Sequence, residues 1–416
     1  MPIRRLPFAA LLGANAISLI GTQLTFVAVP WFVLQTTGSA AKTGLTGAAG
    51  ALATVLAAFF GSIVVDRLGF KRTSILTDLM SGLTVAMIPV LSHTVGLAFW
   101  QLLLLVFLRA LLNTPGATAR QSLLPDLITL AGIGLERGNA AYQTVQYFAQ
   151  LLGPVLAGVL IALLGTRNVL WLDATSFLVS AGIVSAAVPT SHPTRPRHGE
   201  SAGMTSWWTD LREGVRFLRD DRVVYAMAIT STVANFLIAA LFAVILPVYA
   251  KTRFGRALDL GLLFAGFGAG SLVATLLYGV IAARVPRRAT LITGFVIASI
   301  PLWVLAILPS LVVAIGVMVL FGFGIGPLNV LGATVTQERV PLPFRGRVFG
   351  TLFAISGATT PLAVLLSGYL IEGIGLRTIL LGEAACFVSL TGWIAGIRAF
   401  RTMEPSAARV EERHSV

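Results

Sequence analysis

Charged side chains that fall inside the long apolar stretches of this sequence include Arg109, Asp78, Asp173 and Glu383. A carboxylate beside a guanidinium can bind and release a proton, which is the chemistry of proton relays in apolar surroundings. A charge inside such a stretch is costly, so Arg109, with Asp173 or Asp78 as its partner, is the first candidate for proton coupling. The other interpretation of Arg109 is a buried structural ion pair.

Asp173 and Glu383 form a matched pair in the sequence. Each follows a basic residue, Arg167 or Arg377, by six positions. With a rise of 1.5 Å per residue, each carboxyl lies roughly 9 Å along a helix from that basic residue. Both are coupling candidates, and a structural role for the pair is the alternative.

No arrangement typical of a soluble catalytic site is present. The four histidines lie in loops or tails without the spacing of metal ligands, and there is no phosphate-binding G-x-x-x-x-G-K-[ST] motif. The single cysteine, Cys386, lies in an apolar run, which excludes a disulfide framework. We therefore expect no catalytic residues, no metal and no cofactor, and a protein that is not an enzyme.

The apolar stretches that carry these residues are predicted to be membrane-spanning helices. The chain has 416 residues, of which 56% are hydrophobic and 11% are charged, whereas a soluble domain has about 25% charged residues. Runs of about 18 apolar residues can cross a hydrocarbon layer of about 30 Å, and their backbone groups must be satisfied within a helix. The predicted spans are 7–34, 43–65, 74–92, 97–115, 140–164, 168–188, 223–249, 260–282, 290–308, 310–331, 349–371 and 378–398.

The basic residues set the expected orientation of these twelve spans. Of 30 Lys and Arg residues, 23 fall in the segments on the same side as the N-terminus, so the positive-inside rule places both termini in the cytoplasm. The net charge of +13 therefore reflects topology and not a nucleic-acid partner. The predicted domains are a six-helix bundle at 1–188, a cytoplasmic linker at 189–222, a second bundle at 223–399 and a cytoplasmic tail at 400–416.

The linker contains a short amphipathic segment, WWTDLREGVRFLRDD, in which apolar residues recur at helical spacing. Trp, Leu and Arg on such a helix are typical of one that lies along a membrane surface. A solvated linker with a short helix is the alternative.

The two halves of the chain resemble each other. The segments SIVVDRLGFKR, at 62–72, and GVIAARVPRR, at 279–288, lie 217 positions apart, and Ala283 stands in the second copy where the first has Asp66. Other matches recur at offsets between 207 and 217, and the offset changes only between segments, as loop insertions require. Two parallel six-helix halves are predicted, and the fold class is an all-α membrane protein with twelve transmembrane helices in two pseudo-symmetric bundles.

This organisation resembles the major facilitator superfamily. The motif of that family between spans two and three, G-x-x-x-D-[RK]-x-G-x-[RK]-[RK], is matched here by Asp66, Arg67, Gly69, Lys71 and Arg72, with Ser62 in place of the first Gly. The resemblance implies that Asp66 lies near the start of span eleven, where the positive helix end and Arg347 would hold it as a latch. The alternative is a loop that only anchors topology. Asp78 is expected to belong to the charge network of this loop.

Span five contains a second motif of the same family. Gly153, Pro154 and Gly158 resemble the antiporter motif G-P-x-x-G-G, with Ala157 in place of one Gly. Proline bends a helix and small residues allow close packing. The resemblance implies export against a proton gradient, and an ordinary helix kink is the other interpretation.

The resemblance also implies a central cavity lined by spans one, four, five, seven, eight, ten and eleven. Polar side chains at helical spacing in these spans are candidates for its lining, and hydrogen bonding between helices is the alternative role. These candidates are Asn15, Ser18, Thr22, Gln23, Asn113, Gln143, Gln146, Gln150, Thr232, Asn235 and Asn329.

Several softer strings, among them PWFVLQTTGSA, ARQSLLPDL and FRGRVFG, resemble the macrolide-efflux and siderophore-export branch. They imply a monomeric transporter of the bacterial inner membrane that exports an amphipathic small molecule, such as a macrolide antibiotic or a siderophore, by proton antiport and alternating access. The expected partners are that substrate, protons and the lipid bilayer. A lysophospholipid flippase and a non-transporting membrane sensor or scaffold remain alternatives.

Overall fold

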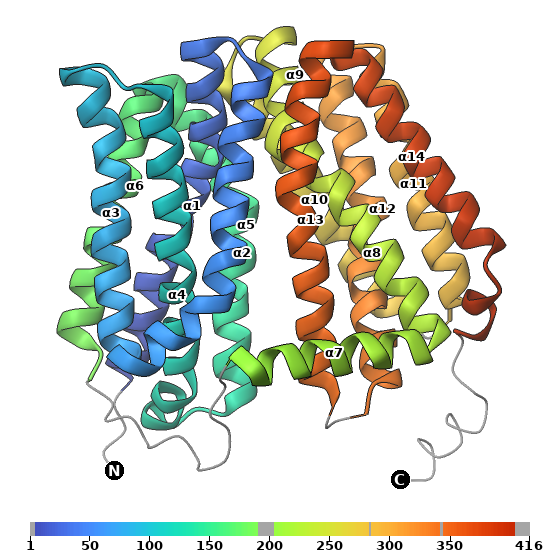
Figure 1. Ribbon diagram of the computed structural model, residues 1–416, viewed down its shortest axis with the longest axis horizontal. Coiled ribbons are helices and arrows are strands. Elements are labelled where there is room, and N and C mark those ends of the chain that lie inside the picture. Colours follow the sequence, from blue (N-terminus) through green and yellow to red (C-terminus); the bar gives the residue numbers. More distant parts are fainter. Residues whose placement is uncertain (1–4, 190–203, 283, 342–343, 404–416) are drawn as a thin grey trace. The chain divides into compact units, whose positions relative to one another are not determined.

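The computed structural model describes residues 5–189, 204–282, 284–341 and 344–403, and these residues form helices and no strands (Figure 1). The all-α prediction is therefore confirmed. The first half of the chain contains α1 (Leu6–Thr37), α2 (Ala40–Leu68), α3 (Phe70–Thr94), α4 (Phe99–Ala131), α5 (Leu135–Leu164) and α6 (Thr166–Ala187).

The second half repeats this order after an additional helix, α7 (Met204–Asp220). Its first span is continuous over 222–253 and contains a π-helical turn, η1, between α8 and α9. The remaining elements are α8 (Arg222–Ala240), η1 (Leu241–Ile245), α9 (Leu246–Arg253), α10 (Ala257–Ile281), α11 (Arg287–Ala306), α12 (Leu311–Arg339), α13 (Arg345–Ile374), α14 (Leu376–Gly396) and the 3-10 turn η3 (Arg398–Thr402).

Eleven spans in the described ranges are long and apolar enough to cross a membrane, and α2 adds a helix of 29 residues at the position of the second predicted span. The twelve-helix arrangement predicted from the sequence fits this structure. The largest boundary error is in span four, which was predicted to end at residue 115 but continues as α4 to Ala131. The extension is helical because Leu123, Leu124, Leu127 and Ile128 form a buried apolar face.

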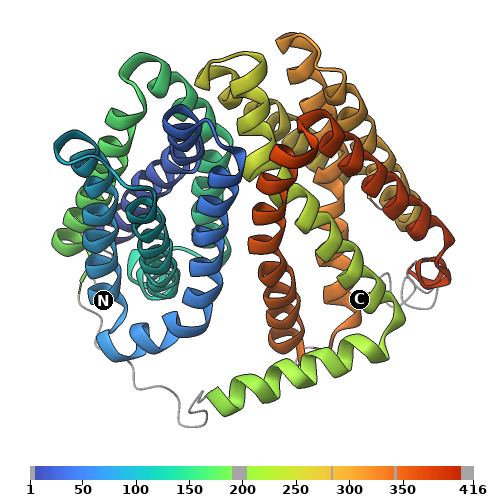
Figure 2. The same cartoon turned by 45° about the horizontal axis from the view of Figure 1, so that its top comes forward.

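The helices form two compact units. Unit 1 comprises the described residues of 1–200, 239–265 and 360–374, and unit 2 comprises those of 201–238, 266–359 and 375–416. In unit 1, α1 lies among α4, α5 and α6, while α3 packs on α4 and α6 (Figure 2). The side chains that α1 presents to the interior of unit 1 are therefore surrounded by other helices.

Glycine allows two close helix crossings in unit 1, at the predicted outer end of its helices. Gly44 of α2 faces Gly368 of α13, and a Cβ on Gly368 would lie 2.6 Å from the carbonyl oxygen of Ala40. Gly158 of α5 faces Gly261 of α10 in the same way, with 3.2 Å from a Cβ to the opposite Cα. Small residues let helix backbones approach closely in membranes, so both crossings depend on these glycines.

A carboxylate completes the crossing of α2 and α13. Glu372, near the end of α13, accepts hydrogen bonds from the hydroxyl of Ser39 and from the backbone N–H of Ala41, at 3.0 Å for the latter. These donors form the start of α2, where the unpaired N–H groups of a helix favour a negative charge. The contact therefore ties the first turn of α2 to the last turn of α13.

In unit 2, α11 packs on α12 and α14, and α7 lies across the ends of α8, α12 and α13 (Figure 1). Leu218 of α7 joins a buried cluster with Val224, Val340 and Val348. Glu213 also pairs with Arg347 of α13, with 2.7 Å between Oε2 and Nη1. Leu218 and the partly buried Phe217 of α7 therefore pack on protein, while the side chains of Trp208 and Leu211 lie outside the described ones.

The Gly44–Gly368 crossing generates a first prediction. A side chain at position 368 must displace the backbone of α2, and overpacking of this kind costs about 1–3 kcal/mol. In a Cys386→Ser background with a cysteine introduced at Ala41, Gly368→Val should raise the rate of maleimide labelling at position 41 by about tenfold or more.

Gly373→Val is the matched control, because a Cβ on Gly373 meets nothing within 4 Å and lies on the same helix. Equal labelling rates in the Gly368→Val and Gly373→Val proteins would show that the crossing does not hold the two helices together.

Candidate functional site

The interior of the first six helices holds two layers of buried polar side chains. The layer nearer the predicted cytoplasmic end, here called the lower rung, consists of Ser18, Asp78, Arg120 and Ser180. Nη1 of Arg120 lies 2.7 and 2.9 Å from the two carboxylate oxygens of Asp78, and the hydroxyl of Ser180 donates to the same carboxylate at 2.7 Å. Arg120 also donates to Ser18 at 3.4 Å. Both charged side chains are buried, so the charges neutralise each other away from water.

The second layer, here called the upper rung, consists of Thr25, Arg109, Asp173 and Ser176. Nη2 of Arg109 lies 3.2 Å from a carboxylate oxygen of Asp173, whose side chain has no exposed surface, whereas that of Arg109 is 11% exposed. The hydroxyls of Thr25 and Ser176 donate to the same carboxylate. The upper rung is therefore a buried acid–base pair whose basic member retains access to the surface of the unit.

Helical spacing explains why the two rungs stack on the same three helices. Ser18 and Thr25 are seven residues apart on α1, Asp173 and Ser180 are seven apart on α6, and the two arginines are eleven apart on α4. Seven and eleven residues correspond to about two and three helical turns, so each helix presents both of its members on one face. Asp78 on α3 completes the lower rung.

Glycines bring these helices close enough for the contacts to form. A Cβ on Gly21 of α1 would collide with Ser176 and Asp173, and a Cβ on Gly116 of α4 would collide with the hydroxyl of Thr77, next to Asp78. Small residues at these two positions allow α6 to approach α1 and α3 to approach α4.

The structure decides between the two partners that the sequence left open for Arg109. The partner is Asp173, and Asp78 instead binds Arg120 and Ser180. The assignment of Asp78 to the charge network of the loop at 66–72 is therefore not supported by its described contacts. Arg120 lies beyond residue 115, the predicted end of span four, but the structure buries it in α4, so this helix contains a second buried arginine besides Arg109. The spacing of eleven residues between the arginines was the signal in the sequence.

The cavity candidates divide by exposure. Asn15 and Ser18 are each only 1% exposed, so neither side chain is open to solvent in the described structure. Ser18 belongs to the lower rung, and the side-chain nitrogen of Asn15 has no partner in the described structure. The exposed candidates are Gln143, Gln150, Asn235 and Asn329, and the partly buried ones are Thr22, Gln23, Asn113, Gln146 and Thr232.

The motif of span five, Gly153, Pro154 and Gly158, lies where α5 crosses α1 and α10. A Cβ on Gly153 would overlap the side chain of Gln23 on α1, Gly158 lies against α10, and the carbonyl oxygen of Pro154 lies next to Gly261. Pro154 is inside α5 and removes one helical hydrogen bond there. Gly153 and Gly158 therefore set how closely α5 approaches α1 and α10.

The loop motif between spans two and three is only partly described. Gly69 adopts a positive φ of 78° in the turn from α2 to α3, and Lys71 donates to the carbonyl oxygen of Ser185 at 2.9 Å. Arg67 and Arg72 are exposed. The side chains of Asp66 and Ser62 lie outside the described residues, and so does any contact of Asp66 with span eleven.

Three aromatic side chains of unit 1 form a cluster beside the π-helical turn. The ring centroids of Phe26 and Phe264 are 5.9 Å apart, and those of Phe242 and Phe264 are 5.2 Å apart. Phe26 is 43% exposed, so one edge of the cluster is open. The turn η1 carries Phe242, and π-helical turns in α-helices frequently mark functional positions.

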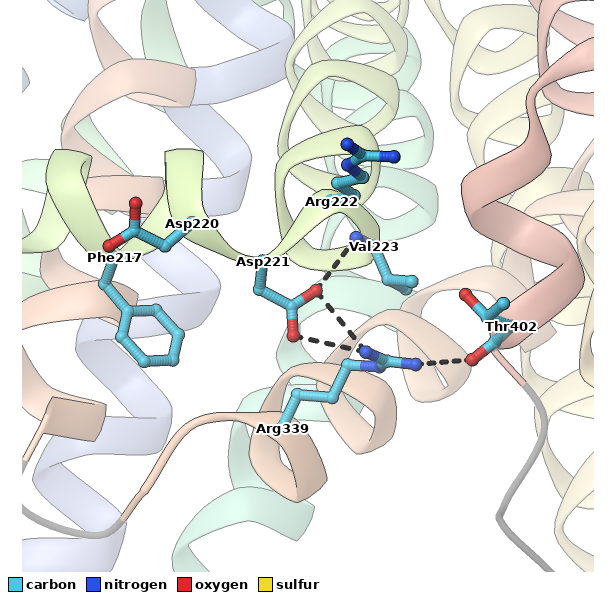
Figure 3. Close-up of a pocket in the computed structure, with 7 residues that line it drawn as sticks. All are labelled: Phe217, Asp220, Asp221, Arg222, Val223, Arg339 and Thr402. Atoms are coloured by element: carbon cyan, nitrogen blue, oxygen red, sulfur yellow. Dashed lines mark hydrogen bonds and ion pairs between the residues drawn. The ribbon is translucent and has the colours of Figure 1, made fainter.

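A surface pocket of about 410 Å³ in unit 2 is a structural junction. Asp221 caps the start of α8 through the N–H groups of Val223 and Val224 and pairs with Arg339 at 3.2 Å (Figure 3). Arg339 in turn donates to the carbonyl oxygen of Thr402. These contacts hold α8, α12 and η3 together.

The comparisons with known proteins agree with this geometry. The family model described as Major Facilitator Superfamily matches residues 11–261 and 228–415. The multidrug efflux pump Tap of Mycobacterium tuberculosis is 32% identical over 393 residues, covering 94% of this chain and 92% of the relative. Macrolide efflux protein A of Streptococcus pyogenes is 22% identical, covering 90% and 91%. The crystal structure of the nucleoside transporter NupG matches with a TM-score of 0.76 at 13% identity, covering 95% and 98%, which shows a shared fold.

The lower rung generates a prediction about stability. Arg120→Met leaves the carboxylate of Asp78 buried without its counter-charge, and breaking a buried pair in this way costs about 3–5 kcal/mol. The thermal unfolding temperature of the purified protein should fall clearly, and Asp78→Asn combined with Arg120→Met should recover most of the loss.

Arg137→Met is the control, because Arg137 is exposed and near the same end of the unit. If Arg120→Met and Arg137→Met unfold at the same temperature, the lower rung does not stabilise the bundle.

Proposed function

The chain belongs to the major facilitator superfamily, and we propose that it is a proton-driven exporter of amphipathic small molecules. The observation that carries this proposal is the upper rung, a buried Arg109–Asp173 pair inside a membrane helix bundle. Relatives of nearly full length bear the names of a multidrug efflux pump and a macrolide efflux protein, which supports export of drug-like substrates.

Asp173 is the group that binds the proton in this proposal. When Asp173 is ionised, Arg109 and the hydroxyls of Thr25 and Ser176 offset its charge in surroundings without water. When a proton binds, Arg109 loses its counter-charge. A change of protonation at this pair therefore alters the forces between α1, α4 and α6, which is how proton binding is coupled to helix movement.

The aromatic cluster indicates the class of substrate. Phe26, Phe242 and Phe264 offer ring faces, and the polar cavity candidates of α5, Gln143, Gln146 and Gln150, carry no charge. Aromatic ring faces bind apolar surfaces, and they attract cations. These features favour a bulky apolar or weakly cationic drug, such as a macrolide, over a small anion.

Alternating access is supported by the contacts at the predicted outer end. The crossings Gly44–Gly368 and Gly158–Gly261 bring segments from both halves of the chain into one unit, and they must separate when the outer side opens. In the same proposal Asp66, within the loop motif, latches the opposite side in the other state. We place the protein in the bacterial inner membrane as a monomer, with both termini in the cytoplasm.

A drug-susceptibility panel with Asp173→Asn tests this function. Asparagine keeps the size of the side chain and its contact with Thr25 but cannot bind a proton. An efflux-deficient host that expresses the wild-type chain should tolerate more macrolide than the empty-vector host, and Asp173→Asn should lose this protection completely at equal membrane content. Asp126→Asn, which changes an exposed carboxylate of α4, should behave as wild type.

Inside-out vesicles then test the coupling. Addition of the protective drug should draw protons out of acidified vesicles that contain the wild-type protein, and not out of those that contain Asp173→Asn. Two results would contradict the proposal: drug protection that persists in Asp173→Asn, or movement of labelled lysophospholipid by the purified protein in liposomes without a pH gradient. The second would instead support a flippase.

A further inference from the structure

The second half of the chain contains a buried carboxyl group that the proposed coupling site does not use. Glu383 lies on α14 and is 5% exposed, and neither of its carboxyl oxygens has a hydrogen-bond partner in the described ranges. One turn further along the helix, Phe387 packs against Phe295 of α11 and Phe321 of α12, at 6.2 and 5.8 Å between ring centroids. Glu383 therefore lies on the face that α14 turns towards the interior of unit 2.

No counter-charge is available on the helices packed against this face. The stretches 289–306 of α11 and 311–337 of α12 contain no ionisable Asp, Glu, Lys or Arg, and their charged residues are confined to one end of each helix. Those end residues are Arg287, Arg288, Glu338 and Arg339. On α14 itself, Arg377 is exposed and lies about 9 Å away along the helix axis.

The internal repeat shows what is different about this carboxyl group. Glu383 is the counterpart of Asp173, since Ala174 and Phe177 also match Ala384 and Phe387 at the same offset of 210. The positions of the second half that match the three partners of Asp173 hold apolar or only weakly polar residues. Arg109 matches Ile325 at an offset of 216, Thr25 matches Phe242 at 217, and Ser176 matches Cys386 at 210.

The energetic consequence follows from this loss of partners. A carboxylate ion at this position has nothing to replace its hydration, so the described packing accommodates only the neutral acid. Even a neutral carboxyl group without a hydrogen-bond partner packs less favourably at this position than a leucine side chain would. The stability of the bundle therefore does not explain why the residue is an acid. The ion can form only in a conformation that admits water to α14.

We propose that Glu383 is a second proton-binding site, located in the C-terminal bundle and separate from the upper rung. The site is loaded with a proton in the conformation described, and it releases that proton to water when the transport cycle exposes α14. The role of this proton in export rests on the proposed function, whereas the protonation of Glu383 does not depend on it.

Infrared spectroscopy of the protein in lipid membranes tests the protonation directly. The difference spectrum between wild type and Glu383→Gln at neutral pH should contain the carbonyl band of one protonated carboxyl group, and Glu383→Asp should shift that band. A difference spectrum with carboxylate bands in its place would overturn the proposal. Arg377→Gln, at the exposed end of the same helix, should leave the band unchanged.

Proteoliposomes test the use of the proton. Protons and drug molecules are counted together with a trapped pH dye and labelled drug, first with wild type. In Glu383→Gln, which resembles the permanently protonated site, the ratio of protons to drug should fall while exchange of drug without a gradient continues. An unchanged ratio would overturn the role in transport. A wild-type protein that moves drug without protons would contradict the proposed function and leave the infrared result standing.

Thermal unfolding of Glu383→Leu excludes a purely structural role. The proposal expects an unfolding temperature equal to or above that of wild type, because leucine fills an apolar site at no polar cost. A clear fall in that temperature, with the same fall in Glu383→Gln, would identify the carboxyl group as structural and overturn the assignment.

Discussion

The first half of the molecule is organised by the need to pair charges that are buried among its helices. Asp78 and Asp173 are both buried among helices, and each has an arginine of α4 within hydrogen-bond distance. A shift of α4 by one turn relative to α3 or α6 would leave two charges without partners, which costs more than most packing errors. The two pairs therefore fix the depth and rotation of these helices, and serine and threonine hydroxyls donate further hydrogen bonds to both carboxylates.

Close approach of the backbones is the condition for that pairing. Gly21 and Gly116 leave room for the carboxylates and their neighbours, and larger side chains there would push the helices apart. Glycines also allow close approach at Gly44 and Gly368, where two helices from different halves of the chain cross. Because lipid gives helices little hydrophobic reason to associate, contacts between small residues carry much of the packing energy in a membrane.

The two halves have diverged in how they treat charge. Among the described residues, the buried acids of the first half, Asp78 and Asp173, are each paired with an arginine, whereas Glu383 in the second half has no described partner. The second half also contains the π-helical turn that carries Phe242, at the position of Thr25 in the first half. A duplicated bundle has thus kept its helices while polar contacts in one copy were replaced by apolar and aromatic ones, so the copies do not perform the same chemistry.

The sequence by itself determined the number, order and repeat of the spans, because the cost of leaving an apolar run in water or a charge in lipid is a local property of each segment. The sequence also identified Arg109 and Asp173 as charges whose burial in an apolar stretch is energetically unfavourable. It ended span four at residue 115, before Arg120, because a helix end beyond the apolar run is set by packing, here by Leu123 and Leu127 in the core. Only the tertiary structure decided which acid meets which arginine and left Asn15 buried, since pairing depends on the depth and rotation of four helices at once.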